Sequence, residues 1–305
     1  MKKLNERSTS VFLIVNPVAG RGRAKRALTE IERALEARGI RCESALTRAP
    51  QDGIVLAQDA LATGTSRIVA VGGDGTVNEV ANGIVRSGAG AEVALGIIPF
   101  GVGNDLARVF GIPRTVRGAI EAICQDRRIR IDVGRVNDRY FLNRFGLGID
   151  AAVVNTYRHI RIARGSIVPY IYAVIRELLA FEEGPVEIHT PEWRYRGAAF
   201  LVNAANAPHT GRYFRITPDA RMDDGQLDLL VIEELPRAVR FLYVLKAMRG
   251  THLSLKKIHL NRVRTVEVNA PTPLPAHIDG DLIGIAAGRF TVEVEPGALT
   301  VITNR

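Results

Sequence analysis

The first 130 residues alternate short apolar runs with stretches of helical spacing, and this alternation constrains the fold more than any other feature. The runs Val11–Val15, Arg67–Val71 and Val93–Ile98 are short and end at Gly- or Pro-containing turns, as buried parallel strands do. Between them, apolar residues recur at helical spacing, first over Ala27–Leu35. We therefore predict an α/β domain with a doubly wound, mostly parallel sheet over about residues 8–130.

The rest of the chain follows a different pattern. After about Arg130, short strand-like runs are separated by turn residues, and two helical stretches interrupt them. This pattern predicts a β-rich antiparallel sandwich over residues 131–305. The further predicted elements are strands at Ile40–Leu46, Ile131–Val136, Tyr140–Phe145, Gly197–Asn203, Leu227–Glu233, Val263–Val268 and Phe290–Val294, and helices at Gly53–Ala62, Thr76–Val85, Val116–Asp126, Tyr170–Phe181 and Arg237–Met248.

The charge and cysteine content limit the classes of partner and compartment. The formal net charge of +9 favours polyanions such as nucleotide phosphates or an anionic membrane. Because the excess is spread over both parts of the chain, we expect no nucleic-acid partner. The two cysteines cannot form a disulfide framework and fit a cytoplasmic protein. The first apolar run is too short for a signal peptide or a membrane span, so we expect any membrane contact to be peripheral.

The strongest motif is VAVGGDGTVNEVANGI, residues 69–84. Two glycines at the end of a strand let the backbone approach phosphate oxygens, and the following helix directs its free N–H groups to the same place. Asp74 cannot bind phosphate itself, because like charges repel. It can hold a Mg²⁺ ion that bridges the phosphates, or orient an attacking hydroxyl. A tight turn with an Asp cap is the alternative, but it does not require all of these residues in a row.

Two more predicted strands end in turns of a similar kind. NPVAGRGRA, residues 16–24, lacks the Gly-Lys-Ser/Thr of a Walker loop, but its glycines and arginines suit either phosphate binding or a flexible turn. PFGVGND, residues 99–105, places Asp105 near the first turn of the next helix, as a ligand-site carboxylate or a cap. Since the carboxyl ends of parallel strands share one edge of a sheet, we predict that the three turns form one ligand site.

Two acidic motifs lie in the second part of the chain. In HIDGDLIG, residues 277–284, an extended chain would place Asp279 and Asp281 on one face. Two carboxylates so placed suit general-base catalysis or a metal–water network. A solvated hairpin turn is equally consistent with this short motif. In TPDARMDDGQLDLL, residues 217–230, the paired aspartates before Gly225 suit either a hard cation or a plain acidic turn.

The order of NPVAG, GGDGTVNEV, PFGVGND, DDGQLD and DGD resembles the diacylglycerol kinase catalytic-domain family, which includes bacterial YegS-like lipid kinases, sphingosine kinases and ceramide kinases. The resemblance covers nearly the whole chain, from about Val11 to Val301. NAD kinases and phosphofructokinases share the GGDGT block, whereas its combination with PFGVGNDLAR and the late DGD is specific to lipid kinases. The resemblance implies transfer of the ATP γ-phosphoryl group to a hydroxyl of a membrane lipid such as diacylglycerol. It also implies that the last residues return to the first domain.

The resemblance further implies which carboxylates carry the chemistry. Asp74, Asp105 and Asp279 would form an acidic network around Mg²⁺. Asp281 stands where the family has a glutamate that acts as proton acceptor. Whether Asp281 or Asp74 is the base stays open.

The remaining implied roles concern nucleotide and metal binding. A structural Mg²⁺ would be held by the Asp224 side chain and by backbone carbonyls near Arg221 and Gln226. Val102 occupies a position at which the family contacts the nucleotide. The other residues implied to bind ATP are Asn16, Pro17, Val18, Ala19, Gly20, Thr47, Gly72, Gly73, Asp74, Gly75, Thr76, Val77 and Asn78.

The sequence departs from the family pattern at three places, and two alternatives stay open, of which only the second draws support from departures, at Val102 and Asp281. Val102 replaces a Thr and loses a hydrogen bond worth about 0.5–1.5 kcal/mol, Asp281 is one methylene shorter than Glu, and residues 209–218 lack a Gly-rich run. The first alternative is a NAD kinase-like phosphotransferase, although the chain lacks the TPTGSTAY-like loop of such enzymes. The second is a non-catalytic, nucleotide-binding membrane regulator.

Two neighbouring segments bear on contact with a membrane. RHIRIARG, residues 158–165, interleaves Arg with Ile and suits either an exposed loop or a surface resting on anionic headgroups. VPYIYAVIRELLAF, residues 168–181, suits either a cover for the sandwich core or the lining of a lipid cleft. The expected partners are thus a lipid substrate and an anionic membrane surface, and the oligomeric state stays open between a monomer and a homodimer.

Overall fold

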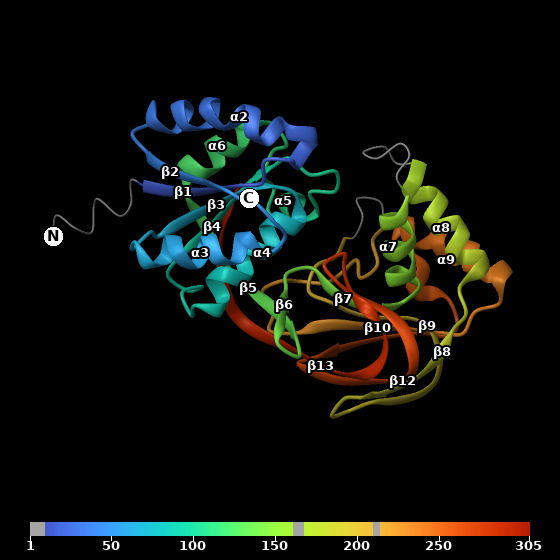
Figure 1. Cartoon of the computed structure of the whole chain (residues 1–305). Helices are drawn as coiled ribbons and strands as arrows, with labels where there is room; N and C mark the ends of the chain where they lie inside the picture. The colour runs from blue at the N-terminus through green and yellow to red at the C-terminus, as the bar shows by residue number, and fades with distance from the viewer. Residues whose placement is uncertain (1–9, 161–167, 210–213) are drawn as a thin grey trace. The chain divides into compact units, whose positions relative to one another are not determined.

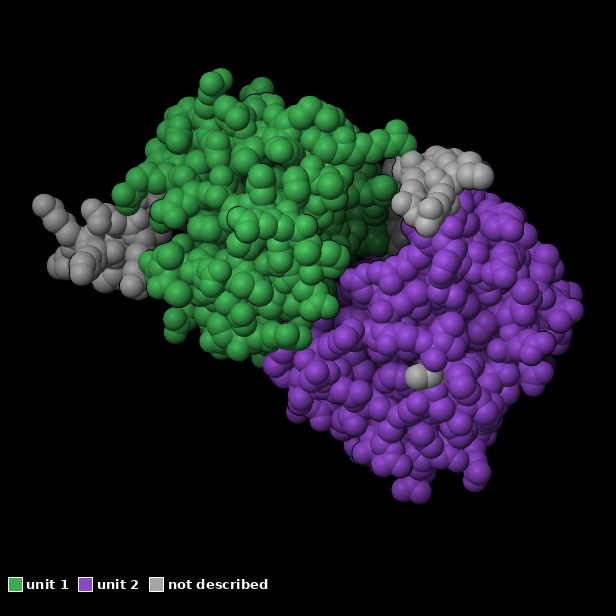
Figure 2. Space-filling view, viewed as in Figure 1, with its two compact units in different colours: residues 1–132, 296–305 green, residues 133–295 purple. Residues whose placement is uncertain are grey.

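A computed structural model describes residues 10–160, 168–209 and 214–305 of the chain. The basic segment 158–165 and the stretch 209–218 therefore lie partly outside the described residues. The chain divides into two compact units, which are coloured separately in Figure 2. Unit 1 comprises Met1–Asp132 together with Pro296–Arg305, and unit 2 comprises Val133–Glu295.

Unit 1 is built on a parallel sheet with helices on both faces (Figure 1). Strands β3 and β4 are buried along their whole length, as the uninterrupted apolar runs predict. The prediction of a doubly wound α/β domain is confirmed. The sheet order is β4-β3-β1-β2, formed by β1 (Ser10–Val15), β2 (Arg41–Leu46), β3 (Arg67–Gly72) and β4 (Ala94–Pro99). Around it lie α2 (Ala19–Glu36) and α6 (Val116–Gln125) on one face, and α3 (Asp52–Ala62) and α4 (Asp74–Arg86) on the other, with the short α5 (Asp105–Val109) after β4.

The C-terminal end of the chain extends the sheet of unit 1. The last strand, β13 (Asp281–Thr303), pairs there in parallel with β4, with Thr300 opposite Ala94. The Thr303 hydroxyl donates to the carbonyl oxygen of Phe110 at 2.9 Å. These contacts hold the last ten residues within unit 1.

Unit 2 is a β-rich structure with antiparallel pairing, so the prediction of an antiparallel sandwich is confirmed. The first half of β9 pairs with β8 and its second half with β7, and β12 divides between the same two partners. Within β12 the register shifts between Ala270 and Leu274, where Pro271 and Pro273 cannot donate ladder hydrogen bonds. The strands besides β13 are β5 (Arg127–Val136), β6 (Arg139–Phe141), β7 (Arg144–Gly148), β8 (Gly184–His189), β9 (Arg194–Ala205), β10 (Leu227–Glu233), β11 (Ile258–Val263) and β12 (Thr265–Ile278).

Three helices pack side by side on the strands of unit 2 (Figure 1). They are α7 (Ile149–His159), α8 (Val168–Ala180) and α9 (Arg237–Arg249), and a short 3₁₀ turn, η1 (His252–Ser254), follows. Among the described residues, no helix is both long and apolar enough to cross a membrane.

Several predicted elements of the second part need correction. Tyr140–Phe145 is not one strand but the end of β6, a turn and the start of β7. Val263–Val268 is likewise interrupted at Arg264, between β11 and β12. The helix α7, the strand β8 and most of β11 were not predicted.

Candidate functional site

The three Gly-rich turns of unit 1 follow strands that end at the same edge of the sheet. Val15 pairs with Val71, and Gly72 pairs with Pro99, so the turns after β1, β3 and β4 emerge side by side. The chain passes to α2 on one face after β1 and to α4 on the other face after β3. Open sheets of this kind bind ligands where successive connections diverge in this way. The predicted shared edge is therefore confirmed.

Asn16 ties the first turn to the second. Its Nδ2 donates to the Thr76 hydroxyl at 3.2 Å, and its Oδ1 accepts from the backbone N–H of Val18 at 3.1 Å. Its own backbone N–H donates to the carbonyl oxygen of Val71 at 3.0 Å. Thr76 is buried in the first turn of α4, so the Asn16 side chain fixes the loop after β1 against the start of that helix.

The loop after β1 contains three consecutive residues with left-handed backbone. Gly20, Arg21 and Gly22 have φ of 59°, 60° and 80°. Glycine adopts this conformation readily, whereas Arg21 does so at a cost of about 1–3 kcal/mol. A Cβ atom on Gly20 would lie 3.1 Å from the Phe100 carbonyl oxygen, so this loop also runs close to the turn after β4. Such strain is characteristic of ligand-binding loops.

The turns after β3 and β4 approach each other too closely for any side chain between them. A Cβ atom on Gly101 would lie 2.7 Å from the Cα of Gly73, and one on Gly72 would lie 2.4 Å from the Thr76 hydroxyl. Asn104 holds the second of these turns: its Oδ1 accepts from the Gly101 N–H and its Nδ2 donates to the Gly101 carbonyl, both at 2.8 Å. The glycines are thus required by the packing of the two loops.

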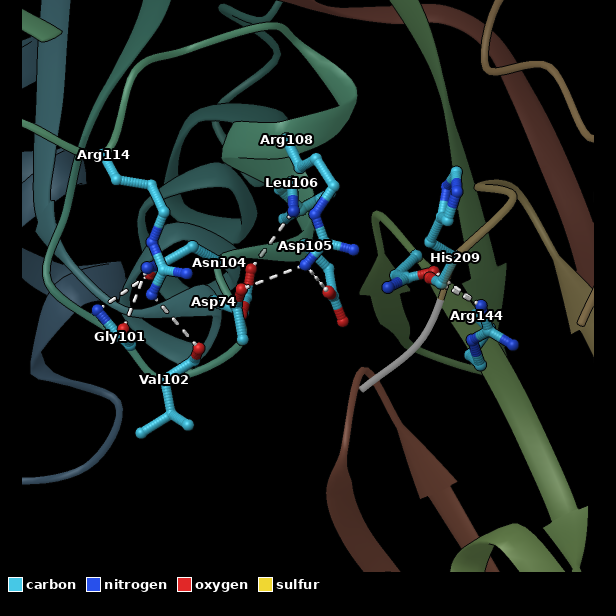
Figure 3. A network of polar contacts seen from close by, with 12 residues as sticks. Asp74, Gly101, Val102, Asn104, Asp105, Leu106, Arg108, Arg114, Arg144 and His209 are labelled. Atoms are coloured by element: carbon cyan, nitrogen blue, oxygen red, sulfur yellow. Dashed lines mark hydrogen bonds and ion pairs between the residues drawn. The ribbon is translucent and has the colours of Figure 1, made fainter. Parts of the chain in front are cut away.

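Asp74 and Asp105 lie next to each other where these two turns meet (Figure 3). Oδ1 of Asp74 accepts from the backbone N–H of Leu106 at 3.2 Å. Burial, together with the charge of Asp105, raises the pKa of Asp74 to about 6, despite the backbone N–H groups that bond to it. Asp105 is itself 6% exposed and accepts from the Arg108 guanidinium at 3.1 Å. A buried carboxylate whose pKa is raised by a neighbouring carboxylate favours a bound cation.

The carboxylates of Asp74 and Asp105 are suitable ligands for Mg²⁺. The ion is usually held by one or two carboxylates together with substrate phosphates and waters. In the part of the chain that the structure describes, no group of three or more His, Cys, Asp or Glu side chains is arranged to hold a metal ion. Asp74 and Asp105 would therefore act as a pair of protein ligands beside the Gly-rich turns.

The other residues predicted to bind nucleotide surround this edge, with different exposure. Val18 is 76% and Val102 60% exposed, whereas Thr47 is buried at the end of β2, where its N–H donates to the Val15 carbonyl at 2.9 Å. The remaining members lie in the first turn of α4, in the loop before α2 or at the start of α2: Pro17, Ala19, Gly75, Val77 and Asn78. The structure brings the predicted unit 1 residues to one edge of the sheet.

Glu79 is a residue of this edge that the sequence reasoning missed. Its Oε1 accepts from the Gln51 N–H at 3.0 Å and its Oε2 from the Gly53 N–H at 3.1 Å. It therefore holds the N-terminus of α3 against α4. The sequence signal that could have identified Glu79 is its position inside the GGDGTVNEV motif.

The Asp279–Gly280 pair of unit 2 forms a two-residue hairpin turn, so of the two alternatives for this motif the hairpin turn is confirmed and the extended chain is wrong. Asp279 and Gly280 have φ of 49° and 84°, and the flanking Ile278 and Asp281 pair with each other. Positive φ at both central residues is typical of the tight turn that joins twisted antiparallel strands. Asp279 therefore belongs to the turn itself, whereas Asp281 begins β13.

The two aspartates of this hairpin have different surroundings. Asp279 accepts three backbone N–H groups, from Leu142 at 2.8 Å, Asn143 at 2.9 Å and Arg144 at 2.7 Å. Its carboxylate thus anchors the turn between β6 and β7. The Asp281 side chain is 63% exposed and pairs with the Arg158 guanidinium at 2.8 Å. Asp281 is the more accessible of the two as a proton acceptor.

Replacing Asp279 with Ala is expected to lower the free energy of unfolding by about 2–4 kcal/mol, because backbone N–H groups lose their acceptor. Asp279→Asn should cost less, since one side-chain oxygen remains to accept. Urea unfolding followed by circular dichroism measures both. Glu192→Ala, an exposed carboxylate in unit 2, serves as the control. Equal stability of Asp279→Ala and wild type would show that the three bonds do not anchor the turn.

A buried polar group lies beneath the hairpin. His277 is 3% exposed, its Nε2 lies 3.0 Å from Oδ2 of Asp150, and its Nδ1 accepts from the Gly280 N–H at 3.2 Å. Asn203 donates to the same Asp150 oxygen at 3.1 Å. Burial acts to raise the pKa of Asp150, but the interaction with His277, together with Arg144 and the Ala151 N–H, outweighs it and lowers that pKa. His277 thereby connects a buried carboxylate to the turn that precedes Asp281.

The predicted structural metal position lies just before β10. Oδ1 of Asp224 accepts from the Gln226 N–H at 3.1 Å, and the Arg221 side chain pairs with Asp223 at 3.1 Å. Burial raises the pKa of Asp228 to about 6 against the effect of Arg262, and the charge of Asp224 adds to the rise. A cation bound by Asp224 would relieve this repulsion. The Arg221 side chain contributes to an ion pair, so only its backbone carbonyl suits a metal.

Comparison with known proteins agrees with the two-part architecture of the chain. The "Diacylglycerol kinase catalytic domain" family model matches residues 10–136, and the "YegS C-terminal NAD kinase beta sandwich-like domain" model matches residues 144–303. The chain is 29% identical over 282 residues to a diacylglycerol kinase of Bacillus subtilis, with 91% of each chain covered. It is 28% identical over 281 residues to one of Staphylococcus saprophyticus, covering 91% of this chain and 90% of the relative. A solved diacylglycerol kinase structure from Bacillus anthracis superposes with a TM-score of 0.74 at 25% identity, over 97% of both chains.

Proposed function

Because the chain belongs to the diacylglycerol kinase catalytic-domain family and is an ATP-dependent lipid kinase, we propose that it moves the γ-phosphoryl group of Mg-ATP to a hydroxyl of a membrane lipid. Diacylglycerol is the first candidate, since the relatives are named for it. The observation that carries the proposal is the buried Asp74–Asp105 pair among three Gly-rich turns. It offers a cation site next to backbone groups suited to phosphate.

Each element of this edge has a part in the proposed reaction. The glycines after β3 let phosphate oxygens approach the backbone, and the N-terminus of α4 directs its N–H groups toward them. Asp74 and Asp105 would hold Mg²⁺, which neutralises the charge that develops on the transferring group. Asn16 and Asn104 keep the loops fixed, so little reorganisation is needed when the nucleotide binds.

The acceptor hydroxyl needs a base, because it is a poor nucleophile until its proton is removed. Asp281 is exposed, stands at the start of a strand and replaces the glutamate of the family. Asp74 is the other candidate, and its pKa of about 6 suits proton transfer near neutral pH. We assign the role to Asp281, because Asp74 would be occupied by the metal.

A transfer assay with γ-labelled ATP and Mg²⁺ tests the proposal over a panel of acceptors. Diacylglycerol, ceramide, sphingosine and monoacylglycerol in mixed micelles are compared with NAD in the same buffer. We expect label in at least one lipid, most strongly in diacylglycerol, and none in NAD. Label in NAD alone would establish the NAD kinase-like alternative, and nucleotide binding without transfer to any acceptor would establish a non-catalytic regulator.

Restoring the usual residue at position 102 should improve nucleotide binding. Val102 is 60% exposed at the turn after β4, so Val102→Thr introduces a hydroxyl without disturbing the core. A single new hydrogen bond is worth about 0.5–1.5 kcal/mol, which corresponds to a two- to tenfold lower Kd for Mg-ATP. Isothermal titration calorimetry measures it, with Val55→Thr, at an exposed position on α3, as the control. A Kd that does not change in Val102→Thr would remove this residue from the nucleotide site.

A further inference from the structure

The exposed apolar side chains of the molecule are concentrated on two adjacent helices of unit 2. Of the sixteen large apolar residues that are exposed in the described part of the chain, nine lie on α8 and α9. We name their outward surface the α8–α9 face. Its apolar members are Val168, Ile171, Tyr172, Ile175 and Leu179 on α8, and Phe241, Leu242, Leu245 and Met248 on α9.

This face is not part of the packing of unit 2. The opposite sides of the helices already fill the core, through Ala173 and Leu178 of α8 and Tyr243 and Ala247 of α9. The outward residues of α8 follow a spacing of three and four, which forms a continuous stripe along one side of the helix. An apolar surface of this extent marks an interaction site.

The exposed, unpaired charges on the two helices themselves have one sign. Arg237 and Arg249 are exposed and Lys246 is half-buried, whereas the one acidic residue of the two helices, Glu177, is buried and pairs with Arg176. Two exposed glutamates, at 182 and 234, lie just beyond the helix ends. An apolar stripe with a basic border is complementary to anionic lipid.

The same charges disfavour a second copy of the chain as occupant. In a symmetric dimer the same patch occurs on both partners, so the basic border of one would lie against that of the other. No exposed carboxylate on α8 or α9 is available to compensate. The exposed Tyr172 also suits the boundary between headgroups and acyl chains.

We propose that the α8–α9 face docks unit 2 on an anionic bilayer, with both helices lying in the plane of the membrane surface. The apolar residues reach the boundary of the acyl chains, and the basic residues lie at the level of the headgroups. This inference deepens the proposed function, since the choice of a bilayer rests on a lipid substrate. For residues 168–181 the sequence left open a cover for the core or a contact with lipid. Under this proposal the inner side of α8 covers the core and its outer side contacts lipid.

The test measures binding to vesicles without ATP, so the result does not depend on catalysis. The vesicles contain phosphatidylcholine with phosphatidylglycerol in equal parts, or phosphatidylcholine alone. The apolar variant is Ile175→Gln with Leu245→Gln, which keeps good helix formers and adds no charge. The basic variant is Lys246→Gln with Arg249→Gln. The control, Val55→Gln with Leu260→Gln, removes exposed apolar residues from α3 and β11.

We expect the apolar variant to bind mixed vesicles about ten- to a hundredfold more weakly at both low and high salt. The basic variant should bind more weakly at low salt only, and the control should bind as wild type does. On a short-chain diacylglycerol dissolved as monomers, the apolar variant should keep wild-type activity. Failure of transfer with normal vesicle binding would reject the proposed function but not the docking face.

Two results would overturn the inference. One is unchanged vesicle binding by the apolar variant. The other is a wild-type dimer that becomes monomeric in this variant, measured by sedimentation equilibrium, while vesicle binding stays the same. The second result would assign the face to another copy of the chain.

Discussion

Replacing Asp74 with Asn is expected to lower the rate of phosphoryl transfer by about 10³-fold or more, while unit 1 keeps its fold. The amide preserves the size of the side chain and can still accept from the Leu106 N–H. It cannot balance the charge of Mg²⁺, so the metal–phosphate assembly beside Asp105 loses a ligand. Steady-state kinetics with saturating ATP and lipid measure the effect.

The same substitution should stabilise the ligand-free protein. The pKa of Asp74 rises from its usual 3.8 to about 6 on folding, so the folded state favours the protonated acid. The wild type therefore loses more stability than Asp74→Asn as the pH rises from about 4 through 6. Thermal unfolding should show little difference between the two proteins near pH 4 and about 1–3 kcal/mol in favour of Asp74→Asn at pH 7.

Asp59→Asn, on the exposed side of α3, is the matched control for both measurements. It should change neither turnover nor the pH dependence of stability. Near wild-type turnover in Asp74→Asn would rule out a role for this carboxylate at the metal or the acceptor. A variant less stable than wild type at pH 7 would contradict the burial argument.

Replacing Asp281 with Asn is expected to lower turnover by about 10²–10⁴-fold, the usual contribution of a positioned base, while the affinity for ATP barely changes. Asp281→Glu should keep much of the activity, because it restores the residue that the family has at this position. Turnover is measured with lipid in mixed micelles, and ATP affinity by calorimetry.

Arg158→Gln separates proton transfer from the ion pair. It removes the partner of Asp281 but leaves the carboxylate, so it should lower activity far less than Asp281→Asn. Unchanged turnover in Asp281→Asn would move the role of base to Asp74. Loss of ATP binding in that variant would indicate a part in the metal network instead.

The architecture of unit 1 could be predicted because each of its signals is local. Apolar runs at β1, β3 and β4 end in glycine or proline turns, and the shared edge of a parallel sheet brings those turns together. The proximity of Asp74 and Asp105 follows from that topology alone. The backbone strain at Arg21 does not, because it depends on how the loop closes.

Unit 2 was harder to predict because its turns depend on contacts between distant residues. Tyr140–Phe145 has the pattern of one strand, but the Asp279 carboxylate accepts the N–H groups of residues 142–144 and holds the chain in a turn there. The helix α7 follows β7 without a loop, because Gly148 at φ 104° allows an abrupt change of direction. Neither effect has a signature in the neighbouring sequence.

The Asp-Gly pair at 279–280 did carry a readable signal. Asp-Gly between strand-like runs is among the strongest short-range indications of a tight hairpin, and the structure has that turn. The buried pair of His277 and Asp150 had none, since 127 positions of sequence separate its members. Only the folded chain brings them together beneath the hairpin.

The central claim is that the terminal phosphoryl group of ATP moves to a lipid hydroxyl. The most direct measurement incubates the protein with Mg²⁺, diacylglycerol in mixed micelles, and ATP labelled in either the α- or the γ-phosphate, and follows label in the extracted lipid. The account predicts a phosphorylated lipid that carries label from γ-labelled ATP only, and none with Asp74→Asn. Label from α-labelled ATP, or γ-label released only as free phosphate with every lipid tried, would contradict it.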